Sequence, residues 1–538
     1  MIHQRLYPIL LPTLLFVGAL QAQSNKLARD LKHGGGPEVD VVVQFNTQPT
    51  EAVYQRIAKW ATKEKGRFGG IRAAHFSVPP QMLEGLASDP AVHYVSPDRP
   101  VRGALDYASE AVGANVALSS YGLRGTGIAV AVIDSGITKM PDLAGQKNST
   151  RVVYEQSFVP GSQTGGDQFG HGTHVAGVVA GNGSASTGTS FFRTFLGVAT
   201  DANLVNLRVL DKDGMGTDSG VIAAIQRAIE LKDTYNIRVI NLSLGRQVME
   251  SYTTDPLCRA VEAAWKAGMV VVVSAGNGGR NNSAGTNGYG TISSPGNHPW
   301  VITVGAMKTM FTIGRGDDQI ASYSGKGPTR FDYIAKPDLV APGNQIISLM
   351  ANGSNLGQAA AGNRIARKEY SNISSNTNSN DYFKLSGTSM AAPMVSGAAV
   401  LLLNQNPSLT PDQVKARLMR TAYKGFPSTS VATDSETGAT YRSQYDIFTV
   451  GAGYLDIAAA LADRYVAGKP AWSPKVQLDT ATGQYRLVMN SSTLWGDSAL
   501  WGDSTLWGDS ALWGDSTLWG DSTGSTAAAL RLLQTGER

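Results

Sequence analysis

The sequence has a single cysteine, no excess of one charge and no long apolar run after its first residues. Because Cys258 is alone, no disulfide can form within the chain. The 46 basic and 42 acidic residues leave a net charge of +4, without the basic block of a nucleic-acid binder. No later apolar run reaches the ~18 residues that a membrane helix needs. We therefore expect no nucleic-acid partner and no transmembrane segment.

The first residues are typical of a secretory signal. Arg5 precedes an apolar run over residues 9–20, and Ala19 and Ala22 are small residues at which a signal peptidase can cut. Residues 1–22 are therefore predicted to be a signal peptide, and the mature protein is expected to be secreted or extracytoplasmic.

Residues 38–102 have the pattern of a small α+β domain followed by a linker rich in proline. The elements predicted in it are strands over 39–45, 71–78 and 91–95 and helices over 50–64 and 80–86.

Residues 104–463 alternate apolar strands with helices, which predicts an α/β fold with a mainly parallel sheet covered on both faces. In such sheets, sites gather at the carboxyl ends of the strands. Residues 351–381 are predicted to be a polar insertion or a long surface loop. The expected strands are 128–133, 203–209, 239–244, 269–274 and 301–304, and the expected helices include 219–232 and 256–267.

Residues 464–538 form a C-terminal extension in which the hexapeptide L-W-G-D-S-[AT] occurs five times from Leu494. This Trp repeat holds five of the nine tryptophans, so these rings, if exposed, would suit carbohydrate, another chain or the protein's own surface. Stacked turns, a weakly ordered tail and a simple spacer are all consistent with the pattern.

Ser389 lies in L-S-G-T-S-M-A-A-P, directly before an apolar helical run. At a helix start its hydroxyl would lie beside unpaired N–H groups and the positive end of the helix dipole, a setting for a nucleophile. A plain helix cap is the alternative.

Few histidines are available to act as a base. Four of the seven precede the main domain, which leaves His171, His174 and His298. His171, in F-G-H-G-T-H, is predicted to stand at a helix start, whereas His174 lies about one turn further and suits a structural role. Asp134 closes the strand G-I-A-V-A-V-I-D, where a buried acid needs a donor such as an imidazole N–H.

Asp134, His171 and Ser389 thus provide an orienting acid, a general base and a nucleophile, in the chain order of subtilisin rather than that of chymotrypsin or the α/β-hydrolases. Four motifs, three of them around these residues, make most of residues 104–463 resemble the subtilisin-like serine peptidases. The matching motifs are A-V-I-D-S-G at Ala131, H-G-T-H-V-A-G at His171, S-A-G-N at Ser274 and G-T-S-M-A-A-P at Gly387.

The resemblance implies a three-layer subtilisin-like fold and a serine endopeptidase that acts on protein or peptide substrates. It assigns the triad to Asp134, His171 and Ser389, and the oxyanion hole to the side-chain amide of Asn277 and the backbone N–H of Ser389. It also implies two substrate-binding edges and one wall of the specificity pocket. The edges are Gly214, Met215 and Gly216, and Ser243, Leu244 and Gly245; the wall is Ser274, Ala275 and Gly276.

By the same resemblance, residues 38–102 are the propeptide, an intramolecular inhibitor and folding aid that is this enzyme's own partner. Self-cleavage of the zymogen is expected between Pro100 and Tyr107. The mature enzyme is expected to be a monomer.

No cofactor is required for the implied chemistry, but the family pattern raises the question of calcium. Asp142, in M-P-D-L, matches a calcium-ligand position of bacterial subtilisins, whereas the loop after the His171 helix does not match their calcium loop. A structural calcium ion is therefore not supported by a matching loop, and the metal ligands stay unassigned. Asp211 and Asp213 are predicted to lie in a solvated turn.

Three alternatives compete with this interpretation. An esterase or lipase would need a G-x-S-x-G elbow, which fails at Ala391. A metal site at His171 and His174 lacks a further obvious ligand. A secreted binding protein built on an inactive peptidase fold would not require the intact triad, although it suits the Trp repeat.

Overall fold

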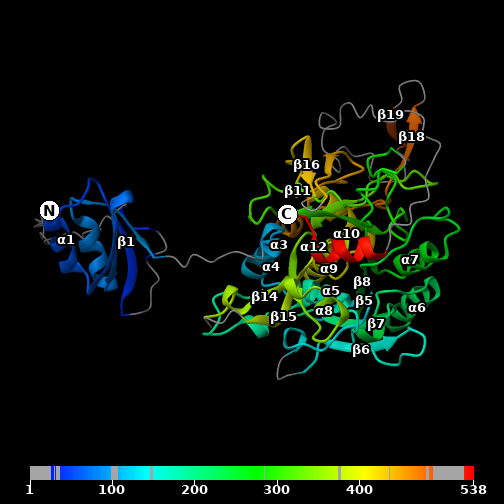
Figure 1. Ribbon diagram of the computed structural model, residues 1–538, viewed down its shortest axis with the longest axis horizontal. Coiled ribbons are helices and arrows are strands. Elements are labelled where there is room, and N and C mark those ends of the chain that lie inside the picture. The colour runs from blue at the N-terminus through cyan, green and yellow to red at the C-terminus, as the bar shows by residue number, and fades with distance from the viewer. Residues whose placement is uncertain are drawn as a thin grey trace, which may run out of the picture. The chain divides into compact units, whose positions relative to one another are not determined.

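The computed structural model divides into two compact units, residues 1–102 and 103–538 (Figure 1). The structure describes residues 26–28, 31, 37–98, 107–145, 149–283, 285–372, 377–434, 437–479, 484–488 and 526–537. The predicted signal peptide, most of the predicted cleavage region and the Trp repeat lie outside these ranges. Within them, no helix combines the length and apolar character that a membrane crossing requires.

The first unit is a four-stranded antiparallel sheet in the order β2-β3-β1-β4, with its own core around Val41, Phe76 and Leu86. The strands are β1 (Val39–Phe45), β2 (Lys63–Phe68), β3 (Ala73–Val78) and β4 (Val92–Pro97). The helices are α1 (Glu51–Ile57) and α2 (Leu83–Ser88).

The helix predicted over residues 50–64 was too long. It ends at Ile57, a 3-10 turn follows, and Lys63–Phe68 forms the edge strand β2 instead. Lys and Glu favour helix locally, but here the backbone pairs with β3, so tertiary pairing overrides propensity.

The second unit is built on an eight-stranded sheet in which every pairing is parallel except that of β11. The order is β11-β10-β9-β8-β5-β7-β6, with β12 also paired to β10. These strands are β5 (Ala129–Asp134), β6 (Val152–Ser157), β7 (Asn203–Arg208), β8 (Ile237–Leu242), β9 (Val270–Ser274), β10 (Ile302–Lys308), β11 (Gln319–Ile320) and β12 (Leu339–Pro342). All five predicted strands are present, and every residue of β5, β9 and β10 is buried, as two covered faces require.

Helices cover both faces of this sheet (Figure 1). The long helices α5 (His171–Ala180) and α9 (Thr388–Gln405) pack against each other and the sheet, and α6 (Asp218–Tyr235) and α7 (Pro256–Lys266) form a second such pair. The predicted three-layer α/β architecture is confirmed. The remaining helices are α3 (Ala108–Ala111), α4 (Ala114–Tyr121), α8 (Asn355–Ala359), α10 (Pro411–Thr421), α11 (Ile457–Ala462) and α12 (Thr526–Thr535).

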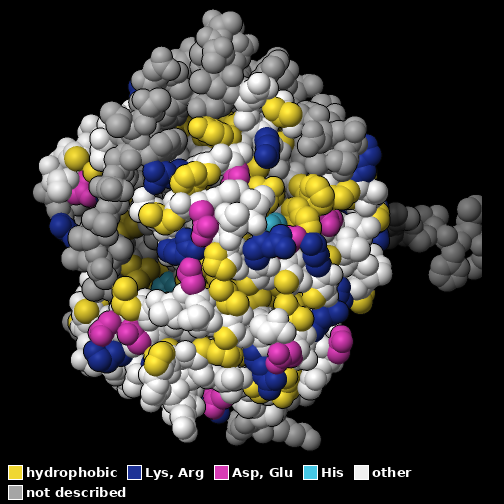
Figure 2. Space-filling model, turned by 90° about the vertical axis from the view of Figure 1, so that its right-hand side faces the viewer, with side chains coloured by type: hydrophobic (Ala, Val, Ile, Leu, Met, Phe, Trp, Pro, Cys, Tyr) yellow, Lys and Arg dark blue, Asp and Glu magenta, His cyan; other side chains and the backbone are white. Residues whose placement is uncertain are grey.

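Smaller sheets complete the second unit. They are β13 (Ile346–Leu349), β14 (Arg364–Ala366) and β15 (Asn378–Leu385), in the order β13-β15-β14, and the hairpins β16 (Thr429–Thr433) with β17 (Thr440–Gln444) and β18 (Lys475–Asp479) with β19 (Gln484–Val488). The segment 351–381, predicted as a loop, contains α8, β14 and the start of β15. Acidic and basic side chains are interspersed over the face shown in Figure 2, in keeping with the balanced charge of the chain.

A buried ionic cluster joins the sheet to the C-terminal extension. The carboxylate of Asp338 lies 2.6 Å from the Lys336 ammonium and 3.0 Å from that of Lys415, and all three side chains are fully buried. Asp338 also accepts hydrogen bonds from the Ser473 hydroxyl at 2.6 Å and from the backbone of Thr303 at 2.8 Å. Burial, which the Asp338 charge only partly offsets, lowers the pKa of Lys336 to about 7.

Asp338→Asn is expected to destabilise the protein by ~3 kcal/mol or more, because it removes the carboxylate charge that pairs with two buried ammonium groups. The exposed Asp233, whose side chain is 96% accessible, provides the matched control in Asp233→Asn. Denaturant unfolding should give a lower midpoint for the first variant and an unchanged one for the second. Equal midpoints would show that the cluster contributes little.

Candidate active site

Asp134 ends the fully buried strand β5, which lies between β7 and β8 in the sheet. Its side chain has no exposed surface, and a carboxylate in that position is costly unless donors surround it. The backbone N–H of Ser135 donates to Oδ1 at 2.7 Å, and Nδ1 of His171 lies 2.7 Å from the same oxygen. The structure thus brings together two of the three predicted triad residues.

His171 is the first residue of α5, and that helix start lies tightly against the end of β5. A Cβ on Gly172 would lie 2.3 Å from the carbonyl oxygen of Gly136 and 3.1 Å from Cβ of Asp134. Only glycine at position 172 therefore lets the helix approach the aspartate closely enough for the imidazole hydrogen bond.

The surroundings of His171 favour its charged form. Burial lowers the pKa of the imidazole, but the charge and hydrogen bond of Asp134, with a further contribution from Asp167, raise it by more. The net pKa of His171 therefore lies above its ordinary value. An imidazolium at this position is stabilised, as a general base needs after it has taken a proton.

Asp167 is a buried residue that the sequence reasoning missed. Its carboxylate accepts hydrogen bonds from the backbone of Gly170 at 2.6 Å, the backbone and hydroxyl of Thr173 at 2.8 and 2.7 Å, and the Ser135 hydroxyl at 2.8 Å. The Ser135 hydroxyl in turn accepts from the backbone of Gly172 at 2.9 Å. This network fixes the start of α5 to the end of β5. An acidic residue shortly before a helix start is the signal that would have found it.

Ser389 is the second residue of α9, and it is partly exposed while its neighbours in the first turn are buried. Its hydroxyl donates to the carbonyl oxygen of Ser243 at 3.0 Å, and the Ser243 hydroxyl donates to the carbonyl oxygen of Ser389 at 2.7 Å. The hydroxyl of Ser389 is therefore turned to Ser243 in this structure rather than to His171. Hydrogen bonds within a catalytic group are often formed only when substrate binds.

Asn277 follows β9 and is held by the helix that carries Ser389. Its Oδ1 accepts from the backbone N–H and the hydroxyl of Thr388, at 2.9 and 3.0 Å. These two bonds fix the amide orientation, because Oδ1 is used and Nδ2 keeps its donor capacity. Gly387, with φ +152°, is needed here, since a Cβ would lie 3.3 Å from Nδ2.

The backbone N–H of Ser389 has no hydrogen-bond partner among the described residues. It lies in the first turn of α9, where N–H groups have no intrahelical acceptor. This N–H and Nδ2 of Asn277 both lie close to Gly387, because a Cβ on that residue would be 3.7 Å and 3.3 Å from the two nitrogens.

The first predicted substrate edge begins within a turn at the surface. Oδ1 of Asp211 accepts from the backbone N–H groups of Asp213 and Met215 at 2.9 and 3.0 Å, which closes the turn. Gly214 has φ +77°, and the side chain of Met215 is 55% exposed. Gly216, which follows, is exposed as well.

The second edge and the predicted pocket wall lie side by side. The Ser274 hydroxyl donates to the carbonyl oxygen of Leu244 at 3.5 Å, so residues 243–245 lie beside residues 274–276. A Cβ on Gly245 or on Gly276 would lie 2.7 or 3.0 Å from the hydroxyl oxygen of Ser293. Ser293, which the sequence reasoning missed, is thus a neighbour of both segments, and its hydroxyl has no partner within the described part of the chain.

Asp142, the residue that raised the question of calcium, is surrounded by protein donors. Its buried carboxylate accepts from the Tyr382 hydroxyl and from the backbone of Ala185, both at 2.6 Å. Burial raises the pKa of Asp142. The ranges described by the structure contain no group of three or more His, Cys, Asp and Glu side chains placed to hold a metal ion. Tyr382 comes from β15, so the sequence around Asp142 could not reveal this partner.

His174 lies about one turn into α5, where its side chain contacts β13 and β15. Its Nε2 lies 2.9 Å from the carbonyl oxygen of Ile346, and its ring packs edge-on against Phe383. Burial lowers the pKa of His174 to about 3, so the ring is neutral. These contacts fit the structural role expected for it.

Comparisons with known proteins find subtilisin-like serine peptidases. The family model described as Peptidase_S8, the subtilase family, matches residues 125–453. Serine protease AprX of Bacillus subtilis is 36% identical over 393 residues, covering 71% of this chain and 82% of AprX. Subtilisin E of the same organism is 33% identical over 422 residues, covering 76% of this chain and 91% of the relative. A crystal structure of a cold-adapted subtilisin-like serine proteinase aligns at 28% identity and TM-score 0.41, over 62% of this chain and 90% of that one.

The family match covers more than half of the chain, and both named relatives exceed 30% identity over more than two thirds of it. Subtilases need no cofactor for catalysis, and they act on peptide substrates. The chain belongs to the subtilase family and is a serine endopeptidase.

Proposed function

We propose that this protein is a secreted endopeptidase, made as a self-processing zymogen, in which Asp134, His171 and Ser389 form the catalytic triad. The observation that carries the proposal is the 2.7 Å hydrogen bond between the buried Asp134 carboxylate and Nδ1 of His171. His171 is the first residue of α5 and Ser389 is the second residue of α9. The packing of these two helices against each other supports Ser389 as the third residue of the triad.

In the proposed mechanism, Asp134 holds the Nδ1–H of His171 and leaves Nε2 free to act as the base. The Ser389 hydroxyl turns from the Ser243 carbonyl to Nε2, gives up its proton and attacks the substrate carbonyl carbon. The imidazolium that forms is stabilised by Asp134 and then protonates the leaving amine. Water, activated by the same imidazole, hydrolyses the acyl-enzyme.

The negative charge that develops on the substrate oxygen would be bound by two donors, the backbone N–H of Ser389 and Nδ2 of Asn277. Thr388 fixes the Asn277 amide before substrate arrives, so little reorganisation is needed during reaction. The side chain of Asn277 is thus assigned to transition-state binding.

We propose that an extended substrate pairs through its backbone with two edges, residues 214–216 and 243–245, as an added β-strand does. Main-chain pairing reads few side chains, which supports broad preference. The wall formed by residues 274–276, together with the small side chain of Ser293, would bound the specificity pocket.

Residues 1–22 are proposed as the signal peptide and residues 38–102 as the inhibitory propeptide. The separate core of the first unit supports an independently folding domain. The mature protein is proposed to be a secreted monomer, with the peptidase domain at residues 104–463 and the extension at residues 464–538. We further propose that Tyr382 and Ala185 satisfy Asp142 in place of a calcium ion.

Asn277→Ala is expected to lower kcat by two or more orders of magnitude with KM nearly unchanged, because the amide meets the oxyanion only in the transition state. Loss of such a donor in a subtilisin costs about 10²–10³ in kcat. Steady-state kinetics on a small peptide substrate measure both constants. A raised KM at constant kcat would assign Asn277 to ground-state binding instead.

The pH profile tests the role of Asp134. Since only neutral His171 accepts the Ser389 proton, kcat/KM should fall as pH drops through the raised pKa of His171. Asp134→Asn removes the charge that raises this pKa, so the acid limb should move to lower pH while kcat falls by ~10⁴. The control Asp233→Asn should change neither. If the acid limb of the Asp134→Asn variant stays at the same pH, the Asp134 charge does not raise the pKa of the catalytic base.

Ser389→Ala should abolish both proteolysis and release of residues 38–102, since the proposed self-cleavage uses the same nucleophile. Triad knockouts in a subtilisin lose about a millionfold in kcat. Mass spectrometry of the purified variant should find the propeptide still attached. Cleavage between Pro100 and Tyr107 in a host without proteases of its own would show that another enzyme matures the protein.

A further inference from the structure

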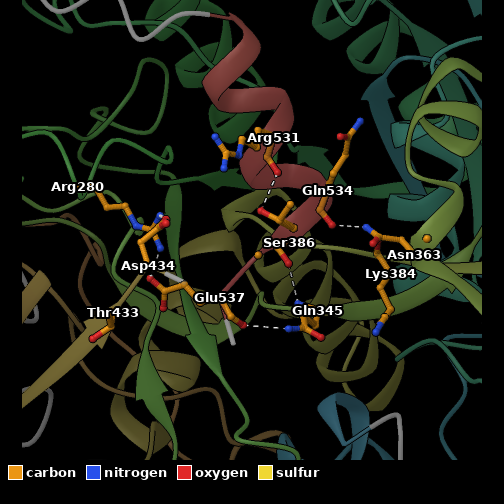
Figure 3. Close-up of a pocket in the computed structure, with 13 residues that line it drawn as sticks. Arg280, Gln345, Asn363, Lys384, Ser386, Thr433, Asp434, Arg531, Gln534 and Glu537 are labelled. Atoms are coloured by element: carbon orange, nitrogen blue, oxygen red, sulfur yellow. Dashed lines mark hydrogen bonds and ion pairs between the residues drawn. The ribbon is translucent and has the colours of Figure 1, made fainter. Parts of the chain in front are cut away.

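The C-terminal end of the chain is bound to the second unit, close to the segment that leads into α9 (Figure 3). The backbone N–H of Ser386 donates to the carbonyl oxygen of Leu533 at 2.9 Å, and the side-chain amide of Asn363 donates to that of Gln534. Both partners lie in or directly beside the small sheet that contains β15. The end of α12 is therefore held by specific backbone contacts as well as by packing.

The backbone of the last described residue, Glu537, is hydrogen-bonded to two side-chain amides. Asn344 donates its amide to the Glu537 carbonyl oxygen at 2.7 Å and accepts from the Glu537 N–H at 2.8 Å. Gln345 donates to the same carbonyl oxygen at 3.0 Å. This pairing resembles that of a β-strand, with side-chain amides in place of a neighbouring backbone.

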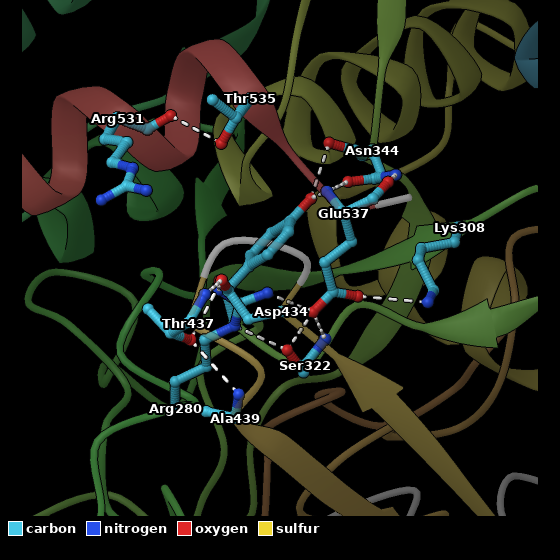
Figure 4. Close-up of polar contacts among 12 residues, drawn as sticks. Arg280, Lys308, Ser322, Asn344, Asp434, Thr437, Ala439, Arg531, Thr535 and Glu537 are labelled. Carbon is cyan, nitrogen blue, oxygen red and sulfur yellow. Dashed lines mark hydrogen bonds and ion pairs between the residues drawn. The ribbon is translucent and has the colours of Figure 1, made fainter.

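The carboxylate of Glu537 enters a charged site in which it is only 4% exposed as a residue (Figure 4). Its Oε1 lies 2.7 Å from a guanidinium nitrogen of Arg280 and 3.0 Å from the backbone N–H of Ser322, and it also accepts from the Ser322 hydroxyl. Its Oε2 lies 3.2 Å from the ammonium of Lys308. Two cations and two neutral donors thus converge on one carboxylate.

The partners of this carboxylate come from separate segments of the peptidase unit. Lys308 is the last residue of β10 and is 4% exposed, and Ser322 follows β11 and is 1% exposed. Arg280 lies three residues after Asn277. Without Glu537, the buried Lys308 would lose its ion pair and the buried N–H of Ser322 would lose its acceptor, whereas Arg280 would keep its ion pair with Asp434 at 2.9 Å. The site is therefore built for a carboxylate.

The residue before Glu537 is also fitted to this position. Gly536 has φ +61°, and a Cβ on it would lie 2.2 Å from the hydroxyl oxygen of Ser386. A glycine directly followed by an acid is therefore the sequence that lets the helix end, turn and insert its carboxylate.

The chain is also attached on the other side of the Trp repeat. The backbone N–H of Val476 donates to the carbonyl oxygen of Tyr333 at 2.7 Å, and that of Ala335 donates to Pro474 at 2.9 Å. Leu487 packs against the cluster that contains Phe448. The described residues that flank positions 489–525 are thus bound to the same unit.

We propose that the peptidase unit contains a binding site for its own C-terminal peptide, with the Glu537 carboxylate as the anchoring group. The site consists of Arg280, Lys308, Ser322, Asn344 and Gln345. It makes the Trp repeat a segment attached at both ends, so that a single cut within the repeat leaves both products on the enzyme.

The proposal is tested on the full chain, in the Ser389→Ala background, with a recognition sequence for a site-specific foreign protease inserted after Ser516. After the cut, gel filtration followed by mass spectrometry shows whether the C-terminal fragment travels with the remainder. We expect retention for the otherwise unchanged chain and at least tenfold faster loss of the fragment with Glu537→Gln, which keeps the shape and removes the charge.

Thr535→Ala is the matched control, because Thr535 is exposed on the same turn and its hydroxyl donates to the carbonyl oxygen of Arg531 within the helix. This variant should retain the fragment. The proposal is overturned if the fragment leaves the unchanged chain, or if Glu537→Gln retains it as firmly. A synthetic peptide of residues 526–538 should compete with the fragment, and its glutamine version should not.

Discussion

The arrangement of the candidate site depends on one buried charge, that of Asp134. Its side chain has no exposed surface, and its Oδ2 has no hydrogen-bond partner among the described residues. The Ser135 N–H and the His171 imidazole therefore provide the compensation at Oδ1. Leaving a buried carboxylate unpaired costs several kcal/mol, so the hydrogen bond between Asp134 and His171 stabilises the fold as well as orienting the imidazole.

Close backbone approach satisfies that charge and places the remaining groups. Gly172 lets α5 begin against the end of β5, and the Asp167 network fixes the two together. Gly387 lets α9 begin against Asn277, whose amide is then oriented by Thr388. Helix starts meet strand ends in both cases, where unpaired N–H groups and carboxylates are available for chemistry.

Sequence reasoning predicted the features that local patterns determine. The apolar runs gave the buried parallel strands, because a strand covered on both faces must be apolar throughout. The motifs around Asp134, His171 and Ser389 gave the candidate triad, although its catalytic roles stay proposals. The predicted helix over 50–64 was too long, because residues 63–68 pair with the neighbouring strand β3 instead.

Other features depend on contacts that no local pattern records. Tyr382 reaches Asp142 across 240 positions of sequence, and Ser293 borders Gly245 and Gly276 only in the fold. The bound C-terminus is of the same kind, because Glu537 meets partners from several separate segments. The sequence T-A-A-A-L-R-L-L-Q-T of α12 favours a helix, but no local pattern shows which surface that helix contacts, so its place on the peptidase unit had to come from the structure.

The central claim is that Ser389 is the nucleophile activated by His171. Its most direct measurement is covalent labelling of the mature enzyme with an organophosphonate or sulfonyl fluoride, followed by peptide mapping. The account predicts one label per chain, on Ser389, and a loss of labelling when His171 is replaced by alanine. Labelling of a different serine, or labelling of Ser389 that persists without His171, would contradict it.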